Sequence, residues 1–224
     1  MTDISALKNL SNNLTQLRIN DWHSIADINT IASLTNLTEL HFVNCPTLTD
    51  LSILKNLNGL TSLTLKNCVN LSDISILKNF TNLNFLYIDC TNVSNLNAIE
   101  GLSALTDLYI VSANITDAHI IESLTNLGNL QFIKCPNITN LGGIESLTNL
   151  WQLVITDCPS LSDINAIGSL TNLYSLSIIN CSNLKDTSVV ENLTVLKTYG
   201  HMSINPPTTS NDTTTSENSN DPIQ

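Results

Sequence analysis

The chain has 224 residues, of which 8 are basic and 19 are acidic, so its formal net charge at pH 7 is −11. Nucleic-acid binding needs clustered Lys and Arg that displace counterions from phosphates, and because the sequence contains no such cluster we expect no nucleic-acid partner. The acidic balance argues against an anionic membrane surface, and no apolar run approaches the roughly 20 residues that cross a bilayer, so we expect no membrane insertion.

The first segment, "TDISALKNL" at residues 2–10, matches the middle of a later segment, "TDLSILKNL" at residues 49–57. It lacks the basic start and the apolar block of a secretory signal peptide. We interpret the chain as a fragment that begins partway through a repeat. The alternative is that this half-repeat serves as a minimal cap for the array.

A unit of 22 or 23 residues then recurs along the chain, as in "LTNLTELHFVNCPTLTDLSILKN" at residues 34–56. Its pattern is L-x-x-L-x-x-L-x-L/F/I-x-x-C-x-x-L-x-D-L/I. Within each unit, two apolar residues separated by one residue show the period-two alternation of a short strand. We expect these strands at residues 17–19, 40–42, 63–65, 86–88, 108–110, 130–132, 153–155 and 176–178, with Tyr199 marking a frayed last rung.

One such unit cannot bury its own leucines, so the units must stack and cover one another's apolar edges. Eight or nine stacked units form a solenoid, in which the strands line the inner, concave wall and the "LSILKN"-type segments return along the outside. We expect this repeat domain to span residues 1–202.

The repeats resemble those of the leucine-rich repeat family. "SLTNLTEL" at residues 33–40 and "LSDISIL" at residues 71–77 are particularly similar to repeats of bacterial internalins, and the same 22-residue class includes a regulatory subunit of protein phosphatase 1. The resemblance covers roughly residues 3–199. It implies an α/β-type leucine-rich repeat solenoid, a curved right-handed coil with a parallel β-sheet on the concave face and short turns or 3-10 segments on the convex face.

Cysteine occupies the position after the strand where this family usually has asparagine, in the five repeats that contain Cys45, Cys68, Cys135, Cys158 and Cys181. A row of thiols suggests a redox centre, a metal site or a structural spacer. Stacked residues project their Cβ atoms in parallel, whereas a disulfide or a tetrahedral metal site needs thiols that converge. We therefore expect buried, unpaired thiols that act as a spacer, with no metal and no cofactor. In the 22-residue unit of Cys90, we expect Thr91 to hold the position instead.

A second column of the repeat contains carboxylate and amide side chains: Asp3, Asp27, Asp50, Asp73, Asn95, Asp117, Asn140, Asp163 and Asp186. Such a row suggests either calcium binding or side chains that cap a turn by accepting backbone N–H bonds. We expect capping, because exchange with asparagine costs a cap little and would weaken a cation site.

Catalytic motifs are missing from the sequence, and the four histidines occupy unrelated repeat positions. Catalysis needs a unique constellation of residues, and a periodic sequence offers few unique residues. We therefore expect a protein that is not an enzyme.

The strand positions that point away from the core vary between repeats, and apolar residues gather there on the middle rungs. We interpret them as an exposed patch that binds a protein partner on the concave wall. The alternative is that these aromatics only pair across strands. Trp151 and Tyr174, where two strands begin, would widen the patch. The candidate binding residues are Glu39, His41, Phe85, Tyr87, Asp89, Asp107, Tyr109, Val111, Ile133 and Val154.

Residues 203–224 contain almost no apolar side chains, and we expect a disordered tail rich in Thr, Ser, Asn and Pro. Two settings remain open for the protein. One is an internalin-like bacterial surface or secreted protein, favoured by the Asn/Thr/Ser composition and the tail. The other is an intracellular scaffold or regulatory subunit, favoured by the unpaired cysteines. In both we expect a monomer that binds one protein partner of unknown identity.

Overall fold

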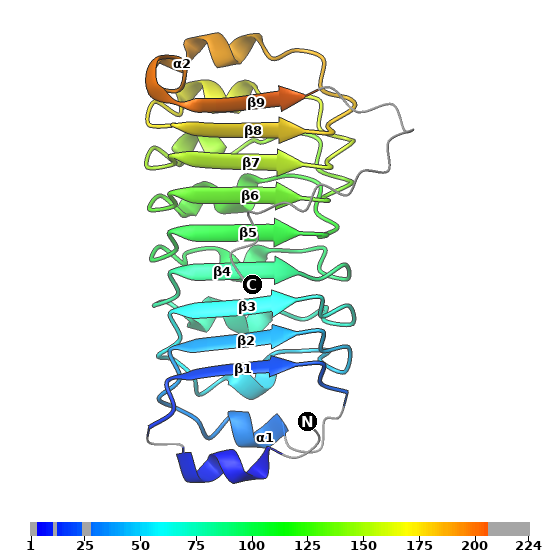
Figure 1. Cartoon of the computed structure of the whole chain (residues 1–224), viewed down its shortest axis with the longest axis vertical. Coiled ribbons are helices and arrows are strands. Elements are labelled where there is room, and N and C mark those ends of the chain that lie inside the picture. Colours follow the sequence, from blue (N-terminus) through cyan, green and yellow to red (C-terminus); the bar gives the residue numbers. More distant parts are fainter. Residues whose placement is uncertain (1–3, 11–12, 24–27, 206–224) are drawn as a thin grey trace.

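A computed structural model describes residues 4–10, 13–23 and 28–205 of the chain. Within these residues, nine five-residue strands form one parallel sheet in chain order (Figure 1). The strands are β1 (Gln16–Asn20), β2 (Glu39–Val43), β3 (Ser62–Lys66), β4 (Phe85–Asp89), β5 (Asp107–Val111), β6 (Asn129–Ile133), β7 (Gln152–Thr156), β8 (Ser175–Ile179) and β9 (His201–Asn205).

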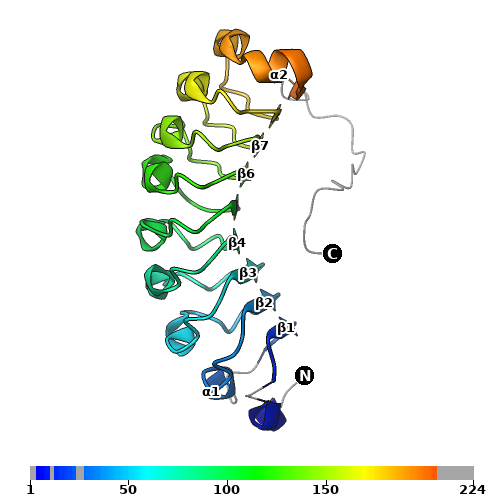
Figure 2. The same ribbon diagram turned by 90° about the vertical axis from the view of Figure 1, so that its left-hand side faces the viewer.

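Short helical segments return the chain from each strand to the next. Figure 2 shows the result as an arc, with the strands along its inner side and the helical segments along its outer side. Most of these segments are 3-10 helices (η), and two are short α-helices. They are η1 (Ser5–Leu10), α1 (Ile28–Ile31), η2 (Ser52–Leu54), η3 (Ser75–Asn79), η4 (Asn97–Ile99), η5 (His119–Ser123), η6 (Ile144–Ser146), η7 (Asn165–Ser169), η8 (Ser188–Asn192) and α2 (Thr194–Tyr199).

The strands pair in strict repeat register, so equivalent residues face each other across the sheet. Leu40 of β2 pairs with Leu63 of β3, which pairs in turn with Leu86 of β4. These leucines are fully buried and belong to one continuous core between the sheet and the helical segments. The predicted leucine-rich repeat solenoid is therefore confirmed, with each unit burying its leucines against its neighbours.

The predicted turn caps are also confirmed. Oδ1 of Asp73 accepts a hydrogen bond from the backbone N–H of Ser75 at 2.8 Å, and Oδ1 of Asp163 accepts one from Asn165 at 2.8 Å. The same bond forms at the other described members of the column, Asp50, Asn95, Asp117, Asn140 and Asp186. All of these caps except that of Asn140 accept from the first residue of a 3-10 helix; the Asn140 cap accepts from Gly142, two residues before η6. Asp3 and Asp27 lie outside the described residues.

The high asparagine content also has a structural explanation. In the "LTNL" segment before a strand, the side-chain amide donates to a backbone carbonyl of the preceding repeat. Asn149 donates to Thr125 O at 2.9 Å and Asn172 to Thr148 O at 2.7 Å. These bonds hold successive repeats together, so the Asn-rich composition does not by itself favour a surface setting.

All six cysteines are free and buried, which confirms the spacer interpretation. Five of the thiols donate to carbonyl groups of the preceding rung, as from Cys45 to Ile19 O at 3.7 Å, and Cys181 donates to Ile179 O of its own strand at 3.6 Å. The prediction for Cys90 was wrong, because its thiol donates in the same way to Leu65 O at 3.7 Å. The turn after β4 is one residue shorter than in the 23-residue repeats. Cys90 therefore occupies the same buried position as the other cysteines although it directly follows the strand.

The thiols form two stacks of three, separated by the buried Ala113. A hydrogen bond to Cys68, followed by burial, raises the pKa of Cys45. A hydrogen bond to Cys158, followed by burial, likewise raises the pKa of Cys181. Cys135 differs, because a hydrogen bond from Cys158 lowers its pKa. Its side chain is nevertheless completely buried, so a reagent in solution cannot reach it.

The last strand differs from the expected frayed rung. Tyr199 ends α2, and β9 then pairs along its whole length with β8, from His201 opposite Ser175 to Asn205 opposite Ile179. The half-buried Ile204 packs against the core and anchors residues that we expected to belong to the tail. The remainder of the predicted tail, residues 206–224, lies outside the described residues.

Candidate functional site

The register brings the middle group of predicted binding residues together on the concave side. Phe85 pairs with Asp107, and Tyr87 pairs with Tyr109, across β4 and β5. Val111 pairs with Ile133 across β5 and β6. Five of these residues form a second apolar cluster, separate from the core. We call Phe85, Tyr87, Tyr109, Val111 and Ile133 the concave cluster.

The members of the concave cluster cover one another, so the predicted exposed patch needs correction. The ring of Tyr109 lies 5.3 Å from that of Phe85 and 5.8 Å from that of Tyr87, measured between centroids. As a result Tyr87 and Tyr109 are each only 6% exposed, and Val111 is also buried. Strands in a sheet lie about 4.8 Å apart, which forces neighbouring rings into contact. Phe85 and Ile133 remain half-buried and form the accessible part.

Side-chain amides fix the far edge of the cluster. Nδ2 of Asn129 donates to the hydroxyl oxygen of Tyr109 at 2.7 Å and to Oδ1 of Asp107 at 3.3 Å. Nε2 of Gln131 donates to Oδ1 of Asn129 at 3.5 Å. Burial, followed by the negative charge of Asp107, raises the pKa of Tyr109. Sequence reasoning did not include Asn129 and Gln131, although their register opposite Asp107 and Tyr109 was the signal for them.

Charged residues border the cluster at the ends of the strands. Asp89 is half-buried at the end of β4. Burial raises the pKa of its carboxyl group, while bonds from Ser112 and Asn67 and the positive charges of Lys66 and Lys134 act in the opposite direction. The accessible apolar surface therefore has carboxylates and ammonium groups beside it.

Of the other five predicted residues, Asp89 and Asp107 border the cluster, and three lie apart from it. Val154 is half-buried on β7, where it pairs with Gln131 rather than with an apolar residue. Glu39 and His41 lie on β2, and Ser62 and Thr64 of β3 separate them from Phe85 and Tyr87.

Glu39 and His41 make their own contacts. Glu39 accepts a hydrogen bond from Nε2 of Gln16 at 2.9 Å, and Nδ1 of His41 lies 2.9 Å from Oγ1 of Thr64. Burial, and then the positive charge of Arg18, lower the pKa of His41. The two residues form a separate polar patch at the N-terminal end of the wall.

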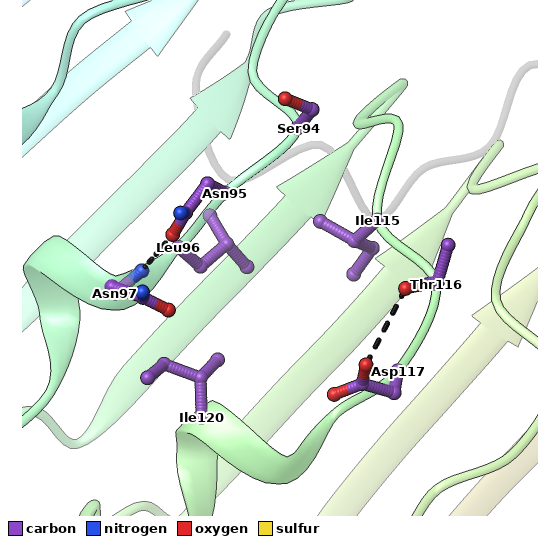
Figure 3. A pocket seen from close by; sticks show the side chains of 8 residues that line it. All are labelled: Ser94, Asn95, Leu96, Asn97, Ile115, Thr116, Asp117 and Ile120. Carbon is purple, nitrogen blue, oxygen red and sulfur yellow. Dashed lines mark hydrogen bonds between the residues drawn. The ribbon is translucent and has the colours of Figure 1, made fainter.

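A cleft of about 220 Å³ between the repeats of β4 and β5 was also missed from the sequence (Figure 3). A backbone bond joins some successive turns, as from Ser162 N to Thr139 O at 3.0 Å, but the described residues form none between Ser72 and Ser94. Between Ser94 and Thr116 the described residues form no such bond, and the turns separate. The two consecutive 22-residue units of this region were the available signal.

Three polar side chains in the cleft, those of Asn95, Thr116 and Asp117, already form hydrogen bonds within the fold. Asn95 accepts from the backbone N–H of Asn97 at 2.7 Å, and Asp117 accepts from that of His119 at 3.2 Å. Oγ1 of Thr116 donates to Asp117, as drawn in Figure 3. No nucleophile and base are brought together among these lining residues.

The described residues offer neither a metal site nor a membrane-spanning helix. No group of three or more His, Cys, Asp or Glu side chains in this part of the chain is placed to hold a metal ion. No helix in the same residues has both the length and the apolar character needed to cross a membrane.

Comparison with known proteins agrees with this geometry. The family described as the BspA type leucine rich repeat region matches residues 19–139 and 106–204, with six copies of its repeat. The chain belongs to this leucine-rich repeat family. No curated protein matches this leucine-rich repeat chain.

Solved structures give the same fold. An internalin (inlF) from Listeria monocytogenes is 25% identical, with a TM-score of 0.58 over 92% of this chain and 72% of the internalin. Internalin C2 (inlC2) from the same organism is 26% identical, with a TM-score of 0.69 over 87% of this chain and 83% of that protein. The leucine-rich repeat domain of the type III effector XopL is 22% identical, with a TM-score of 0.71 over 87% and 70% of the two chains, and is similar in fold alone. The chain is thus an internalin-like leucine-rich repeat protein.

Proposed function

We propose that this leucine-rich repeat protein is a non-enzymatic module that holds a protein partner against its concave wall, in an internalin-like setting at a bacterial surface or in secreted form. Membership of a repeat family whose domains generally bind proteins supports this function. The similarity to two internalins supports the setting.

One observation carries the proposal: β4 to β6 build a second apolar cluster on the side of the sheet that faces away from the core. The repeat does not require it, because the same columns hold Ser62 and Thr64 on β3 and Ser175 and Ser177 on β8. Clustered aromatic residues with polar neighbours are typical of binding hot spots. Since these rings already pack on one another, a partner need not order them on binding.

The accessible residues indicate the chemistry of the partner. Phe85 and Ile133 offer a half-buried apolar centre, and Asp107, Asp89 and Lys66 lie beside it with part of their surface in water. We expect a partner surface with an apolar centre and both signs of charge around it, as in other protein interfaces.

The non-enzymatic part of the proposal rests on how the polar residues are used. Asn95 and Asp117, in the cleft of Figure 3, already accept bonds from the backbone as turn caps. The six thiols are buried in the interior of the coil. These carboxylate, amide and thiol groups therefore already have structural roles in the fold.

Photo-cross-linking tests which face of the coil contacts the partner. A benzoylphenylalanine in place of Phe85 should capture the partner, and the same group in place of the exposed Lys78 on η3 should not. Equal capture from both positions, or capture from position 78 alone, would contradict the concave-wall assignment.

A second candidate is an intracellular scaffold or regulatory subunit that uses the same wall. The six free thiols favour it, because unpaired cysteines are usual in reducing compartments. Antibody labelling of intact cells distinguishes the two settings: labelling without permeabilisation supports the surface, and labelling only after permeabilisation supports the interior.

A further inference from the structure

Two large aromatic side chains are exposed at the edge of the sheet where β7 and β8 begin, the blunt ends of the arrows in Figure 1. Trp151 directly precedes β7 and is 48% exposed, and Tyr174 directly precedes β8 and is 39% exposed. The backbone N–H of Tyr174 donates to Trp151 O at 2.9 Å, so the two residues occupy successive rungs. We call Trp151, Tyr174 and the neighbouring His201 the aromatic ledge.

The ledge departs from the rule of this repeat. The corresponding residue in earlier rungs is often threonine, and its Oγ1 donates to the carbonyl of the rung before. The bond measures 3.2 Å from Thr38, 3.1 Å from Thr61 and 3.2 Å from Thr106. Trp151 and Tyr174 cannot make this bond, and they leave apolar surface in water. Folding therefore does not explain why they are present.

The surrounding residues hold both rings in place. A Cβ atom added to Gly128 would lie 2.9 Å from Nε1 and 3.0 Å from Cδ1 of Trp151, so the indole rests where any larger side chain would collide with it. The ring of Tyr174 meets that of His201 edge to face, with centroids 5.5 Å apart. The ledge is thus ordered without a ligand.

The ledge also lies in the uncharged half of the concave wall. Each of the strands β1 to β5 contributes one Asp, Glu, Lys or Arg, whereas β6 to β9 contain none. The chain as a whole has a net charge of −11, so the absence of charged residues from these four strands distinguishes this part of the wall from the rest of the protein. It fits an uncharged ligand, because these strands offer a charged ligand no Asp, Glu, Lys or Arg with which to pair.

Hydrogen-bonding groups stand beside the rings. Gln152 and Ser175 follow Trp151 and Tyr174 directly, and both side chains are partly exposed. Neither side chain has a hydrogen-bond partner among the described residues. Together they offer an amide donor, an amide acceptor and a hydroxyl group at the border of the aromatic surface.

We propose that the aromatic ledge binds a neutral carbohydrate. The C–H face of a sugar ring stacks on the indole of Trp151, whose ring face is electron-rich, and the sugar hydroxyls bond to Gln152 and Ser175. This site is separate from the concave cluster and does not depend on the proposed protein partner.

The size of the ledge favours this ligand over a second protein. Aromatic side chains each span about 150–250 Å², so the exposed fractions of Trp151 and Tyr174 amount to roughly 200 Å². A standard protein interface needs about 800 Å² on each partner. The ledge matches the footprint of one or two sugar rings.

Fluorescence quenching tests the site directly. The chain has two tryptophans, and since Trp22 is only 4% exposed, acrylamide quenching reports mainly on Trp151. The probes are hexamers of β-1,4-glucose, α-1,4-glucose and β-1,4-N-acetylglucosamine, each at about 10 mM, a concentration that saturates a millimolar site. We expect at least one neutral probe to protect Trp151, and a sulfated oligosaccharide of equal length to give no protection. Lack of protection by every neutral probe, or equal protection by the sulfated one, overturns the proposal.

Three variants assign the binding to the ledge, measured by calorimetry with the protecting probe. Trp151→Thr restores the residue of the other rungs, so it should keep the thermal midpoint and weaken carbohydrate binding at least tenfold. Gly128→Ala displaces the indole and should weaken binding several-fold. Phe85→Ala, in the concave cluster, should leave carbohydrate binding unchanged. The proposal is overturned if the Trp151→Thr variant binds the carbohydrate as tightly as the unmodified protein does. It is also overturned if this variant loses binding to the protein partner but keeps binding to the carbohydrate.

Discussion

The hydroxyl oxygen of Tyr109 accepts a hydrogen bond from Nδ2 of Asn129, 2.7 Å away, although the two residues are 20 positions apart in the chain. Both side chains are buried on the face of the sheet that the core does not use. This contact ties the aromatic rings of β4 and β5 to the amide side chains of β6. The concave wall is therefore a packed structure in its own right.

Tyr109→Phe should lower the free energy of unfolding by about 1 kcal/mol, the usual contribution of one buried hydrogen bond. Tyr109→Ala should cost more, about 2–4 kcal/mol, because it also removes packing against Phe85 and Tyr87. Urea denaturation measures both. Equal stability of the alanine variant and the unmodified protein would show that the concave cluster does not contribute to folding.

Acid should weaken the turn caps. The backbone N–H of Ser75, followed by its side chain, lowers the pKa of Asp73, and Ser188 does the same for Asp186. A carboxyl group whose pKa is lower in the folded state stabilises the fold above its unfolded pKa, near 3.9, and loses that contribution as the pH falls through the folded pKa. We expect the urea midpoint to decrease below about pH 4. Asp73→Asn keeps the cap and should make this decrease shallower, and an unchanged slope would contradict the assignment.

Asp89 should have the opposite effect. Burial raises the pKa of its carboxyl group, so the folded protein holds this proton more tightly than the unfolded chain does. The carboxylate therefore reduces stability as the pH rises through the unfolded value toward the folded one, and the penalty persists at pH 7. Asp89→Asn should raise the urea midpoint at pH 7 and have little effect near pH 3. A lower midpoint at pH 7 would show that the carboxylate is stabilising.

The six thiols should resist labelling in the folded protein. All are buried, and in Cys45 and Cys181 the raised pKa also disfavours the reactive thiolate. Ellman's reagent should modify none of them at pH 8 before unfolding and all six in urea. Rapid labelling of any thiol in the folded protein would contradict the spacer role.

The repeat pattern predicts much of this fold, because each column is a physical requirement repeated eight times. The leucines at 40, 63 and 86 must be buried, and Asp73 and Asp163 must cap their turns, so their roles can be read from spacing alone. Cys90 shows where spacing fails. The turn after β4 is one residue shorter than in the 23-residue repeats. The thiol of Cys90 therefore lies in line with the other buried thiols although Cys90 directly follows the strand.

The candidate site was only partly predictable. Register predicted which of Phe85, Tyr87 and Tyr109 would be neighbours, but their burial depends on how the rings turn toward one another. The role of Asn129 depends on a side-chain bond across one strand pair. The cleft in Figure 3 lies between two consecutive 22-residue repeats, but this spacing alone does not predict that a space opens between their turns.

The most direct test of the concave-wall account uses the partner that photo-cross-linking identifies. This partner is purified in its free form, and its affinity for the Phe85→Ala variant is measured by calorimetric titration. Phe85 is the half-buried aromatic residue of the cluster, and Lys78→Ala on the convex side provides the matched control. We predict that Phe85→Ala weakens binding roughly 30-fold, about 2 kcal/mol, as expected for a hot-spot residue, and that Lys78→Ala leaves the affinity unchanged. Unchanged affinity in Phe85→Ala, with the variant folded, would contradict the account.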